Sequence, residues 1–287
     1  MRILVTNDDG IDSIGLHVLA RSLRDLGEVL VVAPDGEYSG SSAAFGAINL
    51  IEPTGHRSEI EGIDEAYSVS GPPALCVLFA CLGTFGPLPD LVVAGINPGA
   101  NVGRSIYHSG TIGAAVTARS RGISGVAVSQ DVAEVGIEGQ GGEAGLALQR
   151  WETAAQIAVE AARGLLERPG GAPLVLNLNV PNLPRELLAG WRYAEVGTIP
   201  QRALASARLQ PREGHEGGFR ILMEFGASNV LPISVDGGAV SNGYVAVTWL
   251  SPTRHEFDPG HEGACAVEQT LSGLMGAPIL EPTTPCW

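Results

Sequence analysis

The 287-residue chain is 45% hydrophobic and only 17% charged, and 31 acidic residues outnumber 17 basic ones, all arginine, for a formal net charge of −14. This acidity excludes a large nucleic-acid surface, because it would repel a polyanion, and the hydrophobic content excludes a disordered chain. No apolar run reaches the length of about 18 residues that a membrane span needs. The start of the chain lacks the pattern of a secretory signal. We therefore expect a globular, cytoplasmic protein that binds neither nucleic acid polymers nor membranes.

The first 33 residues predict a β-α-β unit. Buried strands are expected at 2–6 and 28–33, and apolar residues at helical spacing predict a helix over 14–26 between them. Such a crossover joins parallel strands in a right-handed connection. The alternation continues along the chain. Further helices are expected at 72–82, 111–121 and from Trp151 to near Pro169, and further strands at 90–94, 123–129 and 174–178.

This alternation predicts an α/β fold, a Rossmann-like parallel sheet with helices on both faces. The periodicity weakens after about Pro184, so we divide the chain into a core of residues 1–184 and a C-terminal extension of residues 185–287. The extension is expected to be β-rich and to end in a helix. Its strands are expected at 220–225 and 243–250, its final helix at 262–275 and a mobile loop or hairpin tip at 208–218, while glycine-rich residues 136–145 of the core predict a surface loop.

Two adjacent carboxylates, Asp8 and Asp9, come directly after the first predicted strand. In an open parallel sheet, ligands bind beyond the carboxyl ends of the strands. Paired carboxylates there repel each other unless a cation lies beside them, and oxygen donors favour Mg²⁺, Mn²⁺ or Ca²⁺ over zinc. Asn and Asp also favour turns, so a simple turn is the alternative interpretation.

Two more polar loops follow the next strands of the predicted sheet. The loop at 34–42 offers the hydroxyls and amides of Ser39, Gly40 and Ser41, and the loop after the third strand contains Asn97 and Asn101. Residues 109–111 (Ser109, Gly110 and Thr111) then begin a helix whose N–H groups suit a phosphate. An ordinary N-cap is the alternative there. Because the three loops meet at one sheet edge, they predict a divalent cation beside a phosphate.

His108 directly precedes this phosphate site, whereas the other five histidines lie outside the loops. A histidine beside a phosphate dianion can carry a positive charge or donate a proton to the leaving group. Alternatively, its side chain packs beside Tyr107 and has no role in the reaction.

The chain resembles the SurE family of stationary-phase survival nucleotidases. The resemblance covers most of the chain and rests on the segments ILVTNDDG (3–10), VVAPDGEYSGSS (31–42), VSGPPALCV (69–77), PDLVVAGINPGANVGRSIYHSGTIGAA (89–115), LVLNLNVPNLP (174–184) and GYVAVTWLSP (243–252). The chain departs from the usual family pattern in three places: Pro72 stands for threonine, Leu75 for aspartate, and His108 for tyrosine.

The resemblance implies a metal-dependent phosphohydrolase that acts on nucleoside 5′- and 3′-monophosphates and exchanges C-terminal elements between subunits. We therefore expect a homodimer or homotetramer with one divalent cation, Mg²⁺ or Mn²⁺, per subunit. Position by position, the implied metal ligands are Asp8, Asp9, Ser39 and Asn97, and the implied phosphate contacts are Asn101, Ser109, Gly110 and Thr111. Gly40 and Ser41 are further expected substrate contacts, and the expected catalytic residues are Asp8, Asp9 and His108.

Two other functions are compatible with the same loops. One is a broader acid phosphatase or exopolyphosphatase, and the other is a nucleotide sensor that binds without turnover. A complete set of metal ligands argues against the sensor. The sequence does not distinguish attack by a metal-activated water from a covalent intermediate.

Overall fold

The computed structural model describes residues 1–46, 52–132, 143–167, 171–200 and 202–251. The described residues from 1 to 250 form one compact unit. The final helix expected at 262–275 lies outside the described residues, as do residues 136–142 of the expected surface loop. In the part of the chain that is described, no helix is long and apolar enough to cross a membrane.

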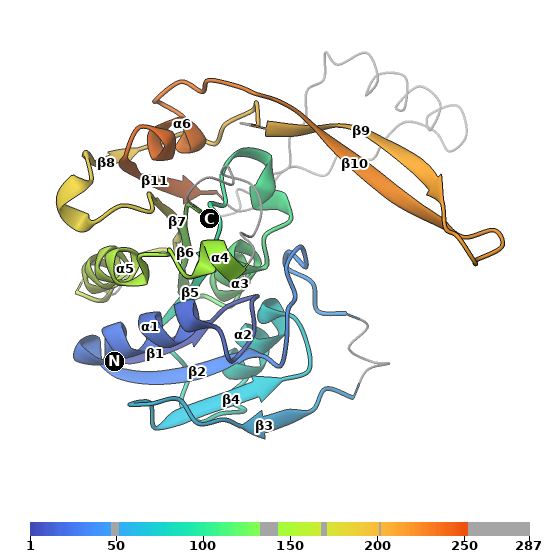
Figure 1. Cartoon of the computed structure of the whole chain (residues 1–287). Helices are drawn as coiled ribbons and strands as arrows, with labels where there is room; N and C mark the ends of the chain where they lie inside the picture. The colour runs from blue at the N-terminus through green and yellow to red at the C-terminus, as the bar shows by residue number, and fades with distance from the viewer. Residues whose placement is uncertain (47–51, 133–142, 168–170, 201, 252–287) are drawn as a thin grey trace, which may run out of the picture. The chain divides into compact units, whose positions relative to one another are not determined.

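Nine strands form one sheet. They are β1 (Arg2–Thr6), β2 (Glu28–Pro34), β3 (Gly55–Arg57), β4 (Glu65–Val69), β5 (Leu91–Pro98), β6 (Ser124–Gln130), β7 (Val175–Val180), β8 (Gly190–Tyr193) and β11 (Tyr244–Leu250). Their order is β3-β4-β2-β1-β5-β6-β7-β11-β8 (Figure 1). The six strands from β4 to β7 in this order are parallel, whereas β3 and β11 run antiparallel to β4 and β7.

The strand order places a ligand crevice between β1 and β5. From β1 the chain adds β2 and β4 on one side, then crosses back to β5 and adds β6 and β7 on the other. Loops that leave β1 and β5 at their carboxyl ends therefore diverge to opposite faces, which is where open α/β sheets bind ligands. The loops that carry Asp8 and Asn101 are the ones that leave these two strands.

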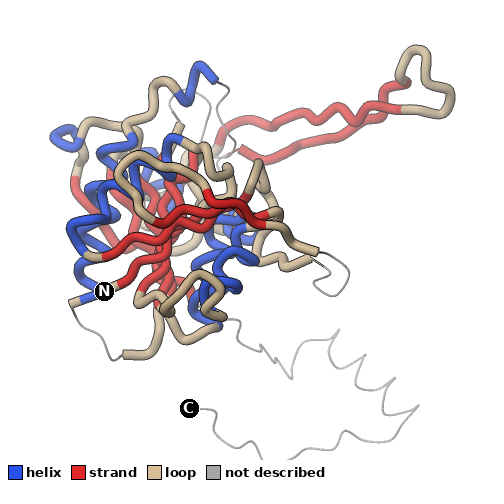
Figure 2. Tube along the Cα trace, turned by 90° about the horizontal axis from the view of Figure 1, so that it is seen from below, coloured by secondary structure: helices blue, strands red, loops and turns tan. Residues whose placement is uncertain are grey.

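Helices cover both faces of the sheet (Figure 2). The helices α1 (Ile14–Leu23) and α5 (Trp151–Leu166) share one hydrophobic core, and α2 (Pro73–Cys81) and α3 (Gly110–Ser120) share another. The short helix α6 (Asp236–Ser241) packs on β11 through Ala239 and Val240. The remaining short helices are α4 (Glu143–Leu146), η1 (Arg24–Leu26), η2 (Gly103–Tyr107) and η3 (Arg185–Leu187).

The α/β class predicted from the sequence is confirmed, with helices on both faces, but several boundaries differ. The first helix ends as a 3₁₀ turn over Arg24–Leu26, and β5 continues to Pro98, so Asn97 lies at the end of a strand and not in a loop. Gly145 belongs to α4 and not to a loop. The division of the chain at residue 184 stays a prediction, although β8 and β11 from the proposed extension do join the core sheet.

Residues 208–218, expected to be a mobile loop or a hairpin tip, form the end of a separate hairpin. The strands β9 (Arg202–Pro211) and β10 (Phe219–Ser228), yellow and orange in Figure 1, pair with each other in an antiparallel sheet. The turn is limited to residues 212–218. β9 is not predicted from the sequence, because its mixture of small, polar and arginine residues is not typical of a buried strand.

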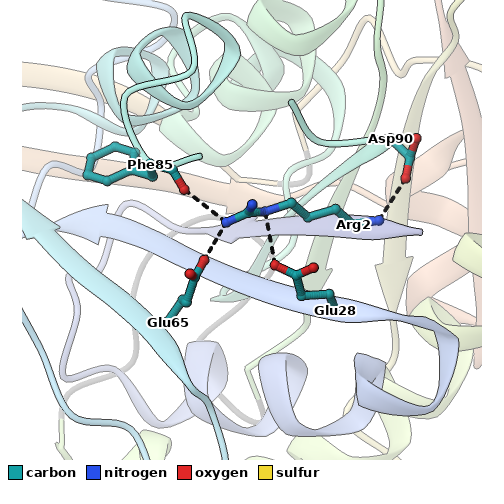
Figure 3. A network of polar contacts seen from close by, with 5 residues as sticks. All are labelled: Arg2, Glu28, Glu65, Phe85 and Asp90. Carbon is teal, nitrogen blue, oxygen red and sulfur yellow. Dashed lines mark hydrogen bonds and ion pairs between the residues drawn. The ribbon is translucent and has the colours of Figure 1, made fainter. Parts of the chain in front are cut away.

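A buried arginine stabilises the sheet at the amino ends of its parallel strands. The site residues lie at the opposite, carboxyl ends of these strands. Arg2 is only 6% exposed, and its guanidinium contacts Glu65, donates to the Phe85 carbonyl at 2.9 Å and lies 3.4 Å from Glu28 (Figure 3). Its backbone N–H donates to Asp90 at 2.7 Å. A buried charge is tolerated only when it is paired in this way, so we assign this network to the joining of β1, β2 and β4.

Candidate active site

A cavity of about 310 Å³ lies at the carboxyl edge of the sheet. It gathers seven of the residues that the sequence predicted for the site, and adds Ser105, which the sequence analysis missed. Ser105 follows Gly103 in η2, and its proximity to His108 along the chain is the signal that could have identified it. The lining residues are Asp8, Ser39, Gly40, Asn97, Pro98, Gly99, Ala100, Asn101, Ser105, His108 and Ser109.

Asp8 is held by the N-terminus of α3. The Thr111 hydroxyl donates to Oδ1 of Asp8 at 2.6 Å, and the Gly110 N–H donates to Oδ2 at 3.0 Å. Burial raises the pKa of Asp8, and the hydrogen bond from the Thr111 side chain acts in the opposite direction. Two donors expected for a phosphate therefore bind a protein carboxylate in this structure. Ser109 is also a true N-cap, because its hydroxyl accepts from the Ile112 N–H at 3.1 Å.

Asp9 is the second carboxylate of the site, and it faces a neighbouring cavity. Burial raises the pKa of Asp9 well above its usual value, and the charges of Asp8 and Glu37 raise it further. Glu37 is a residue that the sequence analysis missed, although it stands two positions before Ser39. Its Oε1 accepts from the Ser39 N–H at 2.8 Å. Asp9, Asp12 and Glu37 line the neighbouring cavity of about 260 Å³ together with Ser13, Ile14, Pro98, Leu146 and Trp151.

The donor set fits a hard divalent cation. Asp8 and Asp9 are near enough for the charge of Asp8 to raise the pKa of Asp9, and a cation beside them would lower this repulsion. The side-chain Nδ2 of Asn97 donates to the Gly99 carbonyl at 2.6 Å. The other amide atom, Oδ1, is therefore the one that can bind a cation. Among the described residues, no three His, Cys, Asp or Glu side chains cluster as a metal site on their own. Ser39 and Asn97 line the same cavity as Asp8 and offer neutral oxygens beside its carboxylate.

Glycines let the three loops approach one another closely. A Cβ atom on Gly110 would lie 2.8 Å from Asp8 and 2.8 Å from the hydroxyl of Ser41. On Gly113 it would lie 2.0 Å from the carbonyl oxygen of Ser42. The loop after β2 is also hydrogen-bonded to the other two, since Tyr38 N–H donates to the Asp8 carbonyl at 2.7 Å and Ser42 N–H to the His108 carbonyl at 3.0 Å. The three loops are thus one packed unit.

Asn101 is fixed by polar side chains of β6 and β7. Its backbone N–H donates to Oδ1 of Asn179 at 2.7 Å, and its carbonyl accepts from Asn177 at 2.9 Å and from Asn179 at 3.1 Å. Its own side-chain nitrogen donates to the Ser129 hydroxyl at 2.9 Å. All of these groups are buried. The contacts explain why two asparagines interrupt the otherwise apolar strand β7.

Comparisons with known proteins identify the family of the chain. Residues 3–202 match the family model described as "Survival protein SurE". The chain belongs to the SurE family. It is 38% identical over 215 residues to a protein of Coxiella burnetii named 5′-nucleotidase SurE, an alignment that covers 75% of this chain and 76% of the relative. A protein of the same name from Haemophilus influenzae is 36% identical over 252 residues, which is 86% of this chain and 90% of the relative.

A solved structure has the same fold. The crystal structure of the SurE protein from Aquifex aeolicus superposes with a TM-score of 0.71 at 28% sequence identity, and covers 96% of this chain and 99% of that one. The matched SurE region runs from residue 3 to 202 and so includes every predicted site residue from Asp8 to Thr111.

Proposed function

We propose that this chain is a metal-dependent phosphohydrolase that releases phosphate from nucleoside 5′- and 3′-monophosphates. The observation that carries the proposal is the adjacent pair of carboxylates at the strand-order reversal, the buried Asp8 and the half-buried Asp9, each of which lines a small cavity there. The activity named for the relatives from Coxiella burnetii and Haemophilus influenzae supports the same reaction.

One divalent cation per subunit, Mg²⁺ or Mn²⁺, would be held by Asp8, Asp9, Ser39 and Asn97. When bound, such an ion polarises a phosphoryl oxygen and lowers the pKa of a coordinated water. The chain's own contribution is to keep its ligands in place before the ion arrives. Asp8 is restrained by Thr111 and Gly110, and Asn97 by the Gly99 carbonyl.

The substrate phosphate would lie in the cavity between Gly40 on one side and Asn101 and Ser109 on the other, with Ser41 next to Gly40 in the same loop. Backbone N–H groups and hydroxyls there stabilise negative charge that develops on the phosphoryl oxygens. The Asn101 side-chain amide can also donate to an anion. A 180° rotation of the amide places Oδ1 beside Ser129, whose hydroxyl then donates to it, and leaves Nδ2 free to donate to the phosphate. Asp9 would orient or deprotonate the attacking water.

The experiment that tests this function is a substrate panel with purified protein. Phosphate release is measured from 5′-AMP, 3′-AMP, p-nitrophenyl phosphate and tripolyphosphate, each with Mg²⁺, with Mn²⁺ and with EDTA. The nucleotidase predicts that the nucleotides have the highest kcat/KM and that EDTA abolishes turnover. Preference for tripolyphosphate or p-nitrophenyl phosphate would instead support the broader phosphatase, and binding of AMP without turnover would support the sensor.

The assembly we propose is a homodimer or homotetramer in the cytoplasm. The hairpin formed by β9 and β10 supports association, because apolar side chains along it are more than half exposed in a single chain. These exposed residues are Leu204, Leu209, Phe219, Ile221 and Met223. Trp191 on the edge strand β8 is also 62% exposed, so it is not covered by its own sheet.

A further inference from the structure

Asp236, far along the chain from the predicted site, binds the loop that forms the cavity. Its Oδ2 accepts from the Gly103 N–H at 2.8 Å, and its Oδ1 accepts from Gly197 at 3.0 Å and from Gly237 at 2.8 Å. The side chain is buried, with the residue 1% exposed. A buried carboxylate is costly unless its oxygens are satisfied, and three N–H donors from three segments satisfy this one.

Gly103 is the point at which the two walls of the cavity meet. Asn97 to Asn101 line the cavity before it, and Ser105, His108 and Ser109 line the cavity after it. Gly103 has a φ of +55°, and a Cβ atom on it would lie 3.1 Å from the Gly197 carbonyl oxygen. Both the backbone conformation and the close approach therefore require glycine at this position. The Asp236 carboxylate holds this turn against the segment that contains Gly197.

We propose that Asp236 is a positioning residue, which fixes the turn at Gly103 and so sets the spacing between Asn101 and Ser105 across the cavity. The inference rests on the phosphohydrolase function proposed above. In this proposal the region after residue 184 contributes to substrate binding through Asp236 of α6, in addition to its proposed role in subunit association. If the Gly103 N–H is released, the cavity loop becomes less ordered in the free protein. Binding of the substrate must then order this loop, and the free-energy cost of that ordering lowers the affinity.

The alternative is that Asp236 only stabilises α6 and acts on nothing beyond it. The substitution Asp236→Asn separates the two roles, because it keeps the shape and keeps one acceptor. Oδ1 can still accept from Gly197 and Gly237, whereas the new Nδ2 faces the Gly103 N–H, donor against donor. The matched control is Asn242→Ala, which removes a 2.8 Å hydrogen bond from the Asn242 side chain to the Gly238 carbonyl within α6 and leaves Gly103 bound.

Two measurements on the full-length protein test the proposal. Hydrogen exchange of residues 99–109 should be at least about tenfold faster in Asp236→Asn than in the wild type, and unchanged in Asn242→Ala. With 5′-AMP at saturating Mn²⁺, the KM of Asp236→Asn should rise about tenfold while kcat changes less than about threefold. The inhibition constant of inorganic phosphate should rise with the KM. Unchanged exchange and unchanged KM, or the same changes in both variants, would overturn the proposal.

Gly103→Ala provides a second variant in case Asp236→Asn does not fold. It strains the same turn from the other side and leaves the Asp236 side chain and α6 intact, so it should raise the exchange rate and the KM in the same way. If the wild type does not hydrolyse any phosphate ester, the proposed function fails. The exchange rates and the affinity for inorganic phosphate then still decide whether Asp236 holds the loop.

Discussion

The Thr111 hydroxyl donates a 2.6 Å hydrogen bond to Oδ1 of Asp8, which is 103 residues earlier in the chain. The contact joins the loop after β1 to the first turn of α3, and the Gly110 N–H reinforces it from the same turn. The positive end of a helix stabilises a carboxylate as well as it stabilises a phosphate. The position of Asp8, and of any cation on it, therefore depends on α3.

Replacement of Thr111 tests this dependence. Thr111→Val removes the hydroxyl at nearly constant volume and leaves Asp8 with one donor fewer. We expect kcat/KM to fall about 10- to 100-fold, in line with the loss of a hydrogen bond to a charged group. Thr111→Ser keeps the donor and should stay within about threefold of the wild type. Equal activity of Thr111→Val and Thr111→Ser would show that Asp8 does not need this contact.

The carboxylate pair makes a prediction about metal binding. Asp8→Asn and Asp9→Asn should each lower kcat at least about 100-fold at saturating metal, because metal catalysis supplies several kcal/mol. Mg²⁺ or Mn²⁺ should raise the Tm of the wild type by mass action and have little effect on the Tm of either variant. Asp12→Asn is the control, since Asp12 is exposed and lines only the neighbouring cavity. Near-wild-type turnover of Asp8→Asn or Asp9→Asn would refute the metal site.

His108 lines the cavity, so its two sequence-based interpretations can be separated by kinetics. If the imidazole protonates the leaving group or binds the phosphate, His108→Phe should lower kcat and change the pH profile of the rate. Metal affinity should stay unchanged. Tyr107→Phe is the matched control, because Tyr107 is 69% exposed. If His108→Phe retains both the rate and the pH profile, His108 does not take part in the reaction, and water protonates the leaving group.

The loops of the site could be predicted because each follows a strand that the sequence marks clearly. The runs at 2–6 and 90–94 are apolar and end in polar residues, and parallel strands place their carboxyl ends at one edge. The residues that support the site could not be predicted in this way. Asp236 is followed by two glycines and preceded by a short apolar segment, a local pattern that predicts only a turn. Its contact with Gly103 spans 133 residues.

The elements that the sequence missed are short or depend on tertiary contacts. β4 contains only the five residues Glu65–Val69, and its Glu65 pairs with the buried Arg2. β9 is exposed along the part whose side chains are described, so it has no buried face to impose a period of two. Local periodicity reports burial, and these segments are held by partners that only the folded chain brings together.

The exposed hairpin predicts an oligomer. A single chain leaves Leu209, Ile221 and Met223 more than 60% exposed on β9 and β10, an arrangement that favours burial against another subunit. Light scattering at micromolar concentration should therefore give at least the mass of a dimer. Ile221→Glu should shift the mass toward the monomer, whereas Arg220→Glu on the same strand should not. A wild-type monomer at these concentrations would contradict the prediction.

Asp131, at the end of β6, makes the stability of the protein depend on pH. Burial raises its pKa to about 6 from a usual value of 3.8. The unfolded chain therefore releases this proton at a lower pH than the folded chain does, and stability falls as the pH rises from about 4 to 6. Asp131→Asn removes the penalty and should be more stable than the wild type at pH 7.5, by about 1 to 3 kcal/mol, but nearly equal to it at pH 4. Urea unfolding of both proteins at the two pH values measures this difference, and the titration of Asp8 and Asp9 cancels because both proteins contain them. A stability difference that is the same at both pH values would show that Asp131 is not the group responsible.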